Sequence, residues 1–463
     1  NNNNNNNNNN DPNDPNNTNQ DDQGQGNTPV VSITGQLAGA GVIVNAEGVL
    51  SLKKNVDRTG KLDRRRRLEV VANLNPDVAK RSKLRKISLN RLEEEVGALI
   101  RNGQRPTQDM LYLAGLTKIQ YVFYYPETKD IVLAGPAEGY TLDEHGRPMG
   151  VFSGDSGLQL EDLVVALRAY GPDGSKAGTV GCSIDPTQEG LTKMQQYLAN
   201  IGGQISGVGA TDEIVRGLKN SLGLQTVTIF GISPNTHFAN ILVEADYRMK
   251  MIGIGLEEPP VRIESYIDRA SPSAVSRNAM QRWYFVPDYD CVRVTDDGLA
   301  AELVGEGVKL VNADELVRGD GTRVQSANPD RASKRFVDSF TQLYPQLAKR
   351  SPVYAQMRDL IDMLIAAAYI QDQGYYEEAN WEMAIFRNEE LVPVEVYAAA
   401  EQVETAVNAV WKGQRLITPV GGGVQIDATR AISASHATPD DGSLAQQRSE
   451  VKVELVAGQW WWD

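Results

Sequence analysis

The tetrapeptide GDSG, with Ser156 at its third position, is the segment whose residue types come nearest to a catalytic motif. A serine nucleophile in such a segment needs a histidine base and a carboxylate, both positioned by a large β-barrel framework. The only histidine that precedes Ser156 in the sequence is His145, which lies eleven residues upstream in a Gly- and Pro-containing turn. Because no barrel fits between them, residues 153–157 are interpreted as a Gly-Ser loop.

Metal chemistry has equally little support in the residue types. The chain has three histidines, His145, His237 and His436, and none has a metal-binding spacing such as HExxH. Its two cysteines, Cys182 and Cys291, form no CxxC pair. The two thiols could form one disulfide, or both could stay unpaired in the core. Their spacing alone leaves both alternatives open.

Carboxylates and glycines are numerous, but their spacing defines no site. A pair among the 60 Asp and Glu residues could carry out glycosidase chemistry, although the sequence does not show which two converge. The glycine-rich stretch 200–210 follows a predicted helix and lacks the lysine of a phosphate-binding loop, so a plain loop is favoured. The Asp- and Asn-rich start of the chain could attract calcium, but its spacing matches no EF-hand loop. We therefore predict no catalytic residue and, beyond this weak calcium alternative, no cofactor.

Three consecutive indoles, Trp460, Trp461 and Trp462, stand beside Asp463. Each indole has about 150–250 Å² of surface to bury, and in an extended chain Trp460 and Trp462 point one way and Trp461 the other. The segment could lie in a groove of its own chain. Alternatively it could dock into a neighbouring subunit or stack on sugar rings. The three tryptophans are therefore candidate subunit or glycan contacts.

The charge is uneven along the chain. A net charge of −14 argues against nucleic-acid binding. Between Lys53 and Arg105, however, sixteen Lys and Arg stand against seven Asp and Glu, which leaves −23 for the remainder. The consecutive Arg64, Arg65, Arg66 and Arg67 could form a basic contact face, or they could fan around a solvated helix.

The length of 463 residues allows two or three domains. Residues 1–28 begin with ten asparagines and offer no apolar side chain, so this tail is expected to be disordered alone or to ladder between identical chains. No apolar run approaches the roughly 20 residues of a membrane span. The chain begins with Asn1 rather than Met, which we interpret as processing or trimming.

The clearest secondary-structure pattern lies between residues 119 and 201. It predicts two strands joined by a Pro-led turn (119–125 and 130–134), a helix (160–170), a strand (179–184) and a second helix with Asp185 as its N-cap. Elsewhere we expect hairpins at 42–52 and 299–311 and strands at 225–232, 261–267, 283–286, 291–295 and 451–456. We also expect helices near Asp63, from Ser88, and at 108–113, 211–222, 331–369 and 401–411. Residues 238–251 are ambiguous.

These elements predict an α+β fold with two mixed α/β units, followed by a mainly helical region with a small β closure. The expected division is an Asn-rich tail (1–29), a β-hairpin with basic helices (30–115), an α+β core (116–330), and a helical region with C-terminal strands and the tryptophan tail (331–463).

Several long stretches also resemble a known family. They are LYLAGLTKIQYVFYYPE, IVLAGPAEGY, LEDLVVALRAYGP, GCSIDPTQEGL, VEADYRMKMIGIGLE, RWYFVPDYDCVRV, ETAVNAVWKGQRL and GQWWWD. They are similar to an uncharacterised family of exported planctomycete proteins built on a domain of unknown function. The resemblance covers nearly the whole chain after about Gly39 and implies a bacterial source and an extracytoplasmic location. It supplies no activity and no catalytic residues.

We therefore expect a non-enzymatic, exported structural protein of the periplasm, cell surface or extracellular space. It would assemble with copies of itself into a filament, tube or lattice. The first alternative is an extracytoplasmic glycan- or peptide-binding module, and the second is a carboxylate-based hydrolase. The expected partners are copies of the chain or a surface glycan, with no nucleic acid and no transmembrane segment.

Overall fold

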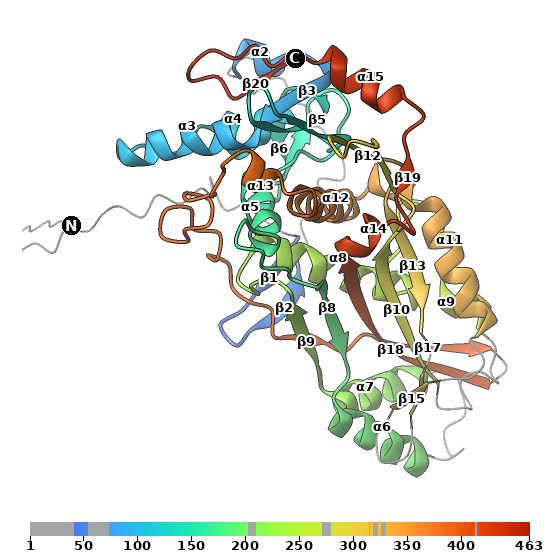
Figure 1. Cartoon of the computed structure of the whole chain (residues 1–463). Helices are drawn as coiled ribbons and strands as arrows, with labels where there is room; N and C mark the ends of the chain where they lie inside the picture. The colour runs from blue at the N-terminus through green and yellow to red at the C-terminus, as the bar shows by residue number, and fades with distance from the viewer. Residues whose placement is uncertain are drawn as a thin grey trace, which may run out of the picture. The chain divides into compact units, whose positions relative to one another are not determined.

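Two β-sheets with helices between and around them organise the chain (Figure 1). The computed structural model describes residues 41–53, 74–201, 210–270, 279–313, 315–317, 323–325, 330–412 and 414–463. All of them belong to one unit, Val31–Asp463. The helix predicted near Asp63, the basic run Arg64 to Arg67, the Asn-rich tail and most of the glycine-rich stretch 200–210 lie outside the described residues.

The larger sheet has eleven described strands and mixes parallel with antiparallel pairs. Its order is β1 (Val42–Val44), β2 (Val49–Leu52), β16 (Gln402–Glu404), β9 (Leu224–Phe230), β8 (Thr179–Asp185), β18 (Gln414–Asp427), β10 (Ala279–Pro287), β14 (Glu315–Val317) and β15 (Arg323–Gln325). In addition, β13 (Val308–Asn312) pairs with β10, and β17 (Val407–Lys412) pairs with β18.

The smaller sheet has seven described strands, in the order β19 (Thr438–Pro439), β11 (Val292–Val294), β12 (Ala300–Leu303), β4 (Tyr121–Tyr125), β5 (Asp130–Ala137), β3 (Ser82–Ser88) and β20 (Trp461–Trp462). β4 and β5 form the predicted hairpin. Its alternation puts Val122 and Tyr124 into the main core and Phe123 and Tyr125 onto the opposite face. A separate two-stranded ribbon consists of β6 (Tyr140–Leu142) and β7 (Pro148–Gly150).

Helix α12 (Pro352–Asp372) is the central helix of the fold and is almost wholly buried. It packs against α5 (Leu160–Ala169) and α8 (His237–Gly253), while the hydroxyl of its Tyr369 reaches the carbonyl of Ala300 on β12. α12 therefore joins the two sheets, as Figure 1 shows. Charged side chains interrupt its apolar surface. No helix within the described ranges is long and apolar enough to cross a membrane.

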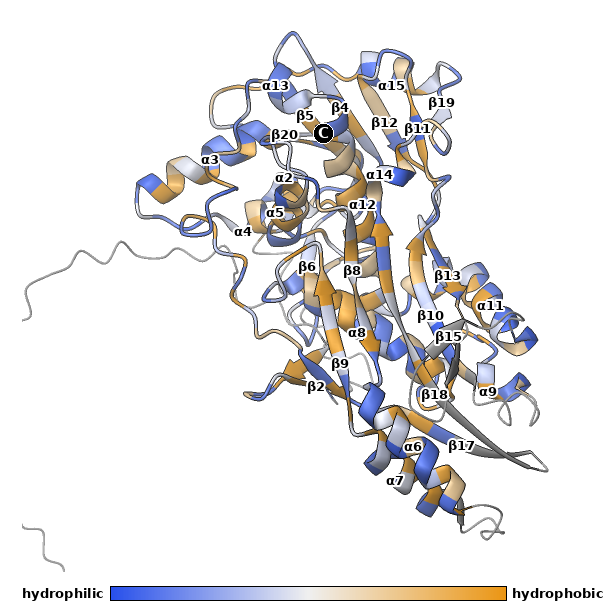
Figure 2. Ribbon diagram, turned by 60° about the horizontal axis from the view of Figure 1, so that its bottom comes forward, coloured by the Kyte–Doolittle hydropathy of each residue, from blue (hydrophilic) through white to orange (hydrophobic). Residues whose placement is uncertain are grey.

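The remaining helices cover outer faces or connect strands. α11 (Arg331–Ala348) packs on β13, and α6 (Gln188–Ile201) pairs with α7 (Ala210–Leu222). Figure 2 shows both hydrophilic and hydrophobic residues along α6 and α7. The others are α2 (Pro76–Ala79), α3 (Leu89–Arg101), α4 (Gln108–Leu111), a 3₁₀ turn (Leu113–Gly115), α9 (Tyr266–Arg269), α13 (Tyr375–Glu378), α14 (Ala428–Ala431) and α15 (Ser443–Glu450).

The α+β class is confirmed, but several predicted elements are wrong. The helix expected at 401–411 is instead β16 and β17, because Val403 and Val407 belong to two short strands separated at Thr405. No strand forms at 261–267, where Ser265 caps α9 by accepting from the Asp268 amide at 3.3 Å. Nor does a strand form at 451–456.

Two further corrections concern chain reversals. The hairpin expected at 299–311 does not exist, because β12 and β13 belong to different sheets and the chain crosses between them through Gly305 and Gly307, both with positive φ. Asp185 does not cap α6. It is the last residue of β8, and the Thr187 hydroxyl accepts from the Gly190 amide at 3.0 Å instead.

The predicted boundaries at 115 and 330 do not separate folding units. β16, β17 and β18 come from the last third of the chain, yet β18 lies between β8 and β10 in the larger sheet. The expected helical region with its own small β closure is therefore wrong. Its strands complete a sheet that begins with β1.

Candidate functional site

The first turns of α5 and α8 bring two carboxylates and a histidine together in the interior. Glu161 and Asp162 follow the first residue of α5, and His237 opens α8 directly after its N-cap, Thr236. The Thr236 hydroxyl accepts from the Ala239 amide at 3.1 Å, which fixes where α8 begins. Acidic residues suit the first turn of a helix because free amide groups there carry partial positive charge.

His237 and Asp162 form a buried pair. The Nδ1 atom of His237 lies 3.0 and 2.9 Å from the two oxygens of Asp162, and the histidine is 1% exposed. Burial disfavours the charged imidazolium, but the Asp162 carboxylate outweighs it and raises the pKa of His237. Nδ1 faces a carboxylate and therefore carries a proton. The other ring nitrogen, Nε2, finds no hydrogen-bond partner among the described residues.

Glu161 is the second acid of this site. The Tyr397 hydroxyl donates to its carboxylate at 2.9 and 3.1 Å, and Glu161 is only 6% exposed. Burial raises the pKa of Glu161 to about 7, against the opposing effects of His237 and the Tyr397 hydrogen bond. The site therefore contains a carboxyl group that changes charge near neutral pH.

A second buried ion cluster continues along the same face of α8. Glu244 lies two turns after His237 and accepts from Arg147 Nη2 at 2.7 and 2.8 Å, from Arg248 Nε at 3.0 Å and from the Gly41 amide at 2.7 Å. Burial alone would raise its pKa, but the two guanidinium groups lower it. Glu244 is therefore ionised, and this cluster ties the β6–β7 ribbon to α8.

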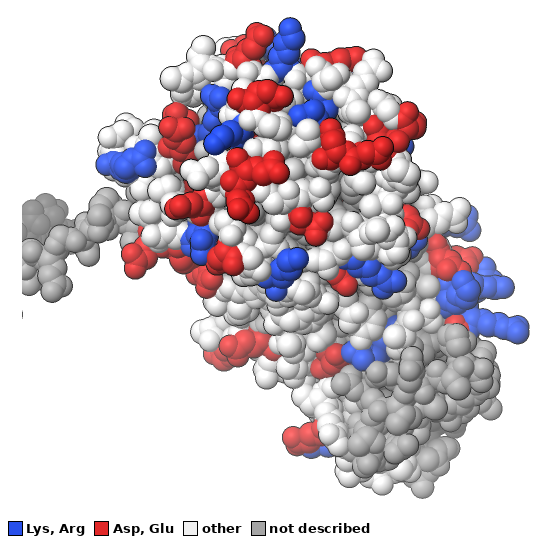
Figure 3. All heavy atoms as spheres, viewed as in Figure 1, with Lys and Arg blue, Asp and Glu red and all other residues white. Residues whose placement is uncertain are grey.

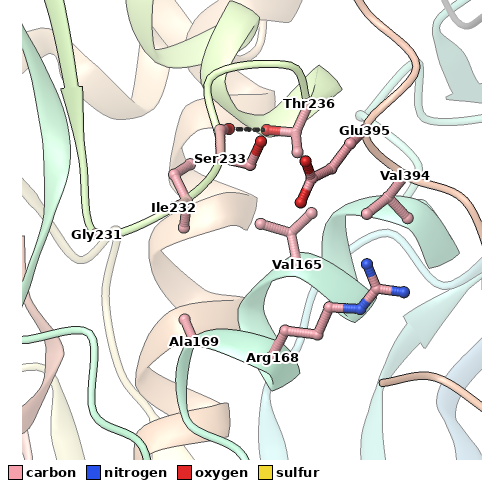
Figure 4. Close-up of a pocket in the computed structure, with 9 residues that line it drawn as sticks. All are labelled: Val165, Arg168, Ala169, Gly231, Ile232, Ser233, Thr236, Val394 and Glu395. Carbon is pink, nitrogen blue, oxygen red and sulfur yellow. Dashed lines mark hydrogen bonds between the residues drawn. The ribbon is translucent and has the colours of Figure 1, made fainter. Parts of the chain in front are cut away.

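A cavity of about 400 Å³ lies beside this site, between α5, the loop from β9 to α8, and residues 394–395 (Figure 4). Its apolar walls are Val165, Ala169, Ile232 and Val394. Val165 lies one helical turn beyond Glu161 and Asp162 on α5, so the acids lie next to the cavity along the helix.

The polar lining consists of Arg168, Ser233, Thr236 and Glu395. Figure 4 shows the Glu395 carboxylate on the same side as Ser233 and Thr236, whereas the guanidinium of Arg168 lies toward Val394. The Thr236 hydroxyl is already engaged with the Ser233 carbonyl at 3.0 Å. Glu395 is exposed and gives the mouth of the cavity a negative charge.

Arg168 fixes the outer wall of the cavity. Its Nε donates to the Phe386 carbonyl at 2.6 Å, its Nη2 donates to the Val392 carbonyl at 2.8 Å, and it forms an ion pair with Glu389. Glu389 in turn accepts from the amides of Val394 and Glu395 at 2.8 Å. The positive charge of Arg168 is therefore already paired.

Tyr397 links the cavity wall to the buried acids. Its amide donates to the Asn235 carbonyl and its carbonyl accepts from Asn235 Nδ2, both at 2.9 Å. Its ring centroid lies 5.7 Å from that of His237. Tyr397 therefore connects the Glu161 carboxylate to the loop between β9 and α8, which forms one wall of the cavity.

Sequence reasoning missed this site. Asp162 and His237 are 75 residues apart in the chain, and a Glu-Asp pair at a helix start or a histidine after threonine has no recognisable spacing. The available signal was the ambiguous stretch 238–251. Read as a helix, it would have put His237 at a helix N-terminus like Glu161 and Asp162.

The segment around Ser156 is structural. The Glu138 carboxylate accepts from the Ser153 amide at 2.7 Å, from the Ser153 hydroxyl at 2.6 Å and from the Phe152 amide at 3.2 Å. His145 lies in the β6–β7 turn, and within the described contacts no hydrogen bond joins it to Ser156. The interpretation as a Gly-Ser loop agrees with these contacts.

Cys182 and Cys291 are both free and buried, so the disulfide alternative is wrong. Cys182 lies on β8 of the larger sheet, whereas Cys291 directly precedes β11 of the smaller sheet. Burial raises the pKa of the Cys291 thiol to about 12 and that of Cys182 well above its usual range. Both thiols behave as apolar core groups.

Of the alternatives for the three tryptophans, the structure shows packing on their own chain. Trp460 is 5% exposed, and Trp461 and Trp462 are half-buried as strand β20 beside β3 of the same chain. The two strand residues lie on opposite sides of the sheet. Trp461 packs on the main core, and Trp462 packs on the cluster around Phe123, which consists of Phe123, Tyr125, Val132, Ala134, Ala300, Leu444 and Val451. Trp460 is therefore enclosed by its own chain in this conformation, whereas Trp461 and Trp462 keep part of their surface exposed.

The predicted basic face at Arg64, Arg65, Arg66 and Arg67, and the calcium alternative at the tail, lie outside the described residues. Where the structure does describe the chain, no group of three or more His, Cys, Asp or Glu side chains is arranged to hold a metal ion. On the face shown in Figure 3, acidic and basic side chains are interspersed.

Comparison with known proteins gives one match. Residues 182–266 match a family model described as a protein of unknown function, DUF1598. The matched segment runs from β8 to the start of α9, so it includes His237 and the β9–α8 loop but neither Glu161 nor Tyr397. The chain thus contains a domain of unknown function, as the resemblance implied. No curated protein and no solved structure matches.

Proposed function

We propose that this protein is a binding module whose cavity between α5 and α8 accepts a lysine side chain, or a similar primary ammonium group, of a peptide. The observation that carries the proposal is the charge around the cavity. The Glu395 carboxylate stands at its mouth, whereas the guanidinium of the nearby Arg168 is already paired with Glu389. Glu161 and Asp162 lie one turn along α5 behind the lining, and Asp162 is paired with His237.

The shape of the cavity supports the same class of ligand. Val165, Ala169, Ile232 and Val394 offer apolar contact for a methylene chain, and about 400 Å³ exceeds the volume of one side chain. An ammonium group at the end of such a chain would meet the Glu395 carboxylate and the Ser233 hydroxyl. A neutral sugar would gain less from this arrangement because its recognition does not use a net negative charge.

Calorimetric titration tests this proposal. The ligands are short lysine-containing peptides, the same peptides with acetylated lysine, and neutral oligosaccharides. The lysine peptides are expected to bind and the acetylated ones to lose affinity. Glu395→Gln should weaken binding roughly two- to fivefold, as expected for loss of a partly exposed ion pair. Glu390→Gln, an exposed carboxylate of the same loop outside the cavity, is the matched control. Binding of oligosaccharides alone, or of no ligand, contradicts the proposal.

Hydrolysis at the same site is a second candidate, favoured by the Asp162–His237 pair. Nε2 of His237 is enclosed in this conformation, so the reaction would require α5 and α8 to part and admit water. Nε2 would then take a proton from that water as it attacks a carbonyl carbon, and would return the proton to the leaving group. His237→Gln would then abolish turnover of a peptide or ester substrate while peptide binding persists. Equal turnover by this variant and the unmodified chain contradicts the candidate.

The expected assembly with copies of itself, and export to the cell surface, stay predictions. The argument for assembly from an exposed C-terminal end no longer holds, because the indoles pack on the same chain.

A further inference from the structure

The last residues of the chain occupy a docking site on the edge of the smaller sheet. β20 pairs antiparallel with β3, placing Trp461 opposite Ile87 and Trp462 opposite Lys86. The Ser88 amide donates to the Trp460 carbonyl at 2.9 Å, which extends the pairing by one residue. The docked strand is short, so backbone hydrogen bonds alone cannot account for its placement.

Arg85 is the centre of this docking site. It is 0% exposed, and its Nε and Nη2 donate to the two oxygens of Asp463 at 2.8 and 3.0 Å. Its other bonds go to the carbonyls of Asp77, Val78, Lys80 and Ala114, between 2.6 and 3.2 Å. The Trp461 ring covers the guanidinium at 4.6 Å. The site therefore recognises an indole and a carboxylate together.

An empty docking site would be costly for the fold. Removal of Asp463 would leave the buried guanidinium of Arg85 with carbonyl partners but without its carboxylate partner, which is destabilising even though the Asp463 side chain is partly exposed. The site thus requires a carboxylate, but nothing in its contacts requires that the carboxylate belong to the same copy of the chain.

The connection to the docked strand is weakly held. Residues 451–459 contain no helix or strand, and Val456 near their middle is 70% exposed. Val451 and Val453 of this tether pack on the cluster around Phe123. Nine extended residues span up to about 32 Å, so the tether is long enough to leave its own sheet.

We propose that the segment from Trp460 to Asp463 of one copy docks on β3 and Arg85 of a second copy, so that two chains exchange their C-terminal strands. Each contact in the exchanged pair is one already present within a single chain. The exchanged pair differs from two separate chains only in the path that the tether follows.

Docking within one chain competes with this exchange. A flexible tether of this length gives the strand a local concentration on the order of millimolar at its own site. The exchanged pair is therefore expected at high protein concentration, or where copies are held close together. Acid favours opening as well, since protonation of Asp463 removes the charge that Arg85 holds.

Complementation between two variants tests the exchange. The acceptor lacks residues 460–463 and has an empty docking site. The donor carries Arg85→Met, which disables its own site but keeps its C-terminal strand. Mixed in equal amounts, they are expected to form a one-to-one complex that is absent for either variant alone, as measured by native mass spectrometry and light scattering.

The carboxylate supplies the specificity control. Adding Asp463→Asn to the donor should weaken the complex roughly tenfold, since the buried Arg85 guanidinium loses a charged partner whose own side chain is 41% exposed. Adding Glu454→Gln, an exposed residue of the same tether, should leave the affinity unchanged. If both variants fold and stay separate, or if Asp463→Asn has no effect, the proposal is overturned.

A folding defect does not obscure the outcome. An acceptor that folds only when the donor is added supports the exchange. If the acceptor is not rescued, unmodified chains labelled with ¹⁴N and ¹⁵N are mixed at high concentration, acidified and returned to neutral pH. Dimers of mixed mass then support the exchange, and their absence overturns it.

Discussion

At the scale of single residues, the interior contains several buried ionisable side chains, on α8 and α12 in particular. Lys250 on α8 is 1% exposed and donates to Asp246 at 2.7 Å and to the Ile184 carbonyl at 2.9 Å. Arg358 on α12 donates to Asp359 at 2.7 Å. Each cation is paired with a carboxylate. These clusters therefore bear on how stability depends on pH, and they are not by themselves a sign of catalysis.

Asp362 on α12 is the clearest case. It is 4% exposed, one of its oxygens finds no hydrogen-bond partner among the described residues, and burial raises its pKa to about 7. Lys118 and Arg358 lower this pKa, while Asp359 and Glu306 raise it. Because the folded state holds this proton more tightly, stability should fall as pH rises from about 4 to about 7.

Asp362→Asn should therefore increase the free energy of unfolding at pH 8 by roughly 2–4 kcal/mol and change it little at pH 4. Chemical denaturation at the two pH values measures this difference. Asp372→Asn, an exposed site at the end of the same helix, is the control and should have little effect at either pH. A destabilised Asp362→Asn variant at pH 8 would show that the carboxylate has a partner that stabilises its charge.

Glu161 leads to a prediction about binding. With a pKa of about 7, Glu161 is neutral below that pH and negative above it. Lysine-peptide affinity should accordingly rise between pH 6 and pH 8. Titrations with Glu161→Gln should show a flatter profile, whereas Glu390→Gln should keep the original one. An identical profile for Glu161→Gln and the unmodified chain argues against a role for this acid.

At the scale of elements, β18 has a sequence that looks unlike a strand. Gly421, Gly422 and Gly423 suggest a flexible turn, yet all three pair with β10, and Gly422 and Gly423 also pair with β8 on the other side. A Cβ on Gly422 would stand 1.9 Å from the Trp283 carbonyl oxygen, and one on Gly423 would stand 1.9 Å from that of Cys182. Only glycine lets the neighbouring backbones approach this closely.

Gly423→Ala should therefore destabilise the chain by several kcal/mol, because backbone atoms on β8 would have to move. Thermal unfolding measures the effect. Gly174→Ala is a useful comparison, because that position has positive φ but open space around it, so its cost should be only about 1 kcal/mol. A Gly423→Ala variant with unchanged unfolding temperature would show that β8 and β18 are not tightly paired.

Local pattern predicted the elements that depend on neighbours in sequence. The β4–β5 hairpin, α5, α7 and α12 all follow from periodicity and turn residues. β16 and β17 could not be predicted in this way, since they become strands through pairing with β2, β9 and β18. The cavity and the neighbouring acids Glu161 and Asp162 could not be predicted from the sequence for the same reason. Asp162 meets His237 only after α5 and α8 pack together.

At the scale of the whole molecule, the two sheets are built from distant segments. The larger sheet combines β1 and β2 with β16 and β18, and the smaller one combines β3 with β20. Neither sheet is complete before the last third of the chain is added. This explains why composition and linker signals suggested boundaries that the structure does not contain.

A fragment of residues 1–330 should consequently fail to fold. It would retain β8 and β10 without β18 between them and would lack α12, which joins the sheets. Circular dichroism and denaturant titration should show no cooperative unfolding. Adding residues 331–463 as a separate chain should partly restore the cooperative unfolding transition. A cooperative transition in the fragment alone would instead establish an independent unit.

The position of β18 also affects how the chain is made. A ribosome synthesises residues 414–427 long after β8 and β10 have emerged. These two strands therefore lack β18, the strand that lies between them in the sheet, until late in synthesis. Such long-range pairing is expected to make folding slow and to leave unpaired edges exposed meanwhile. Nascent chains of this protein should thus depend on chaperones more than a chain of equal length that folds segment by segment.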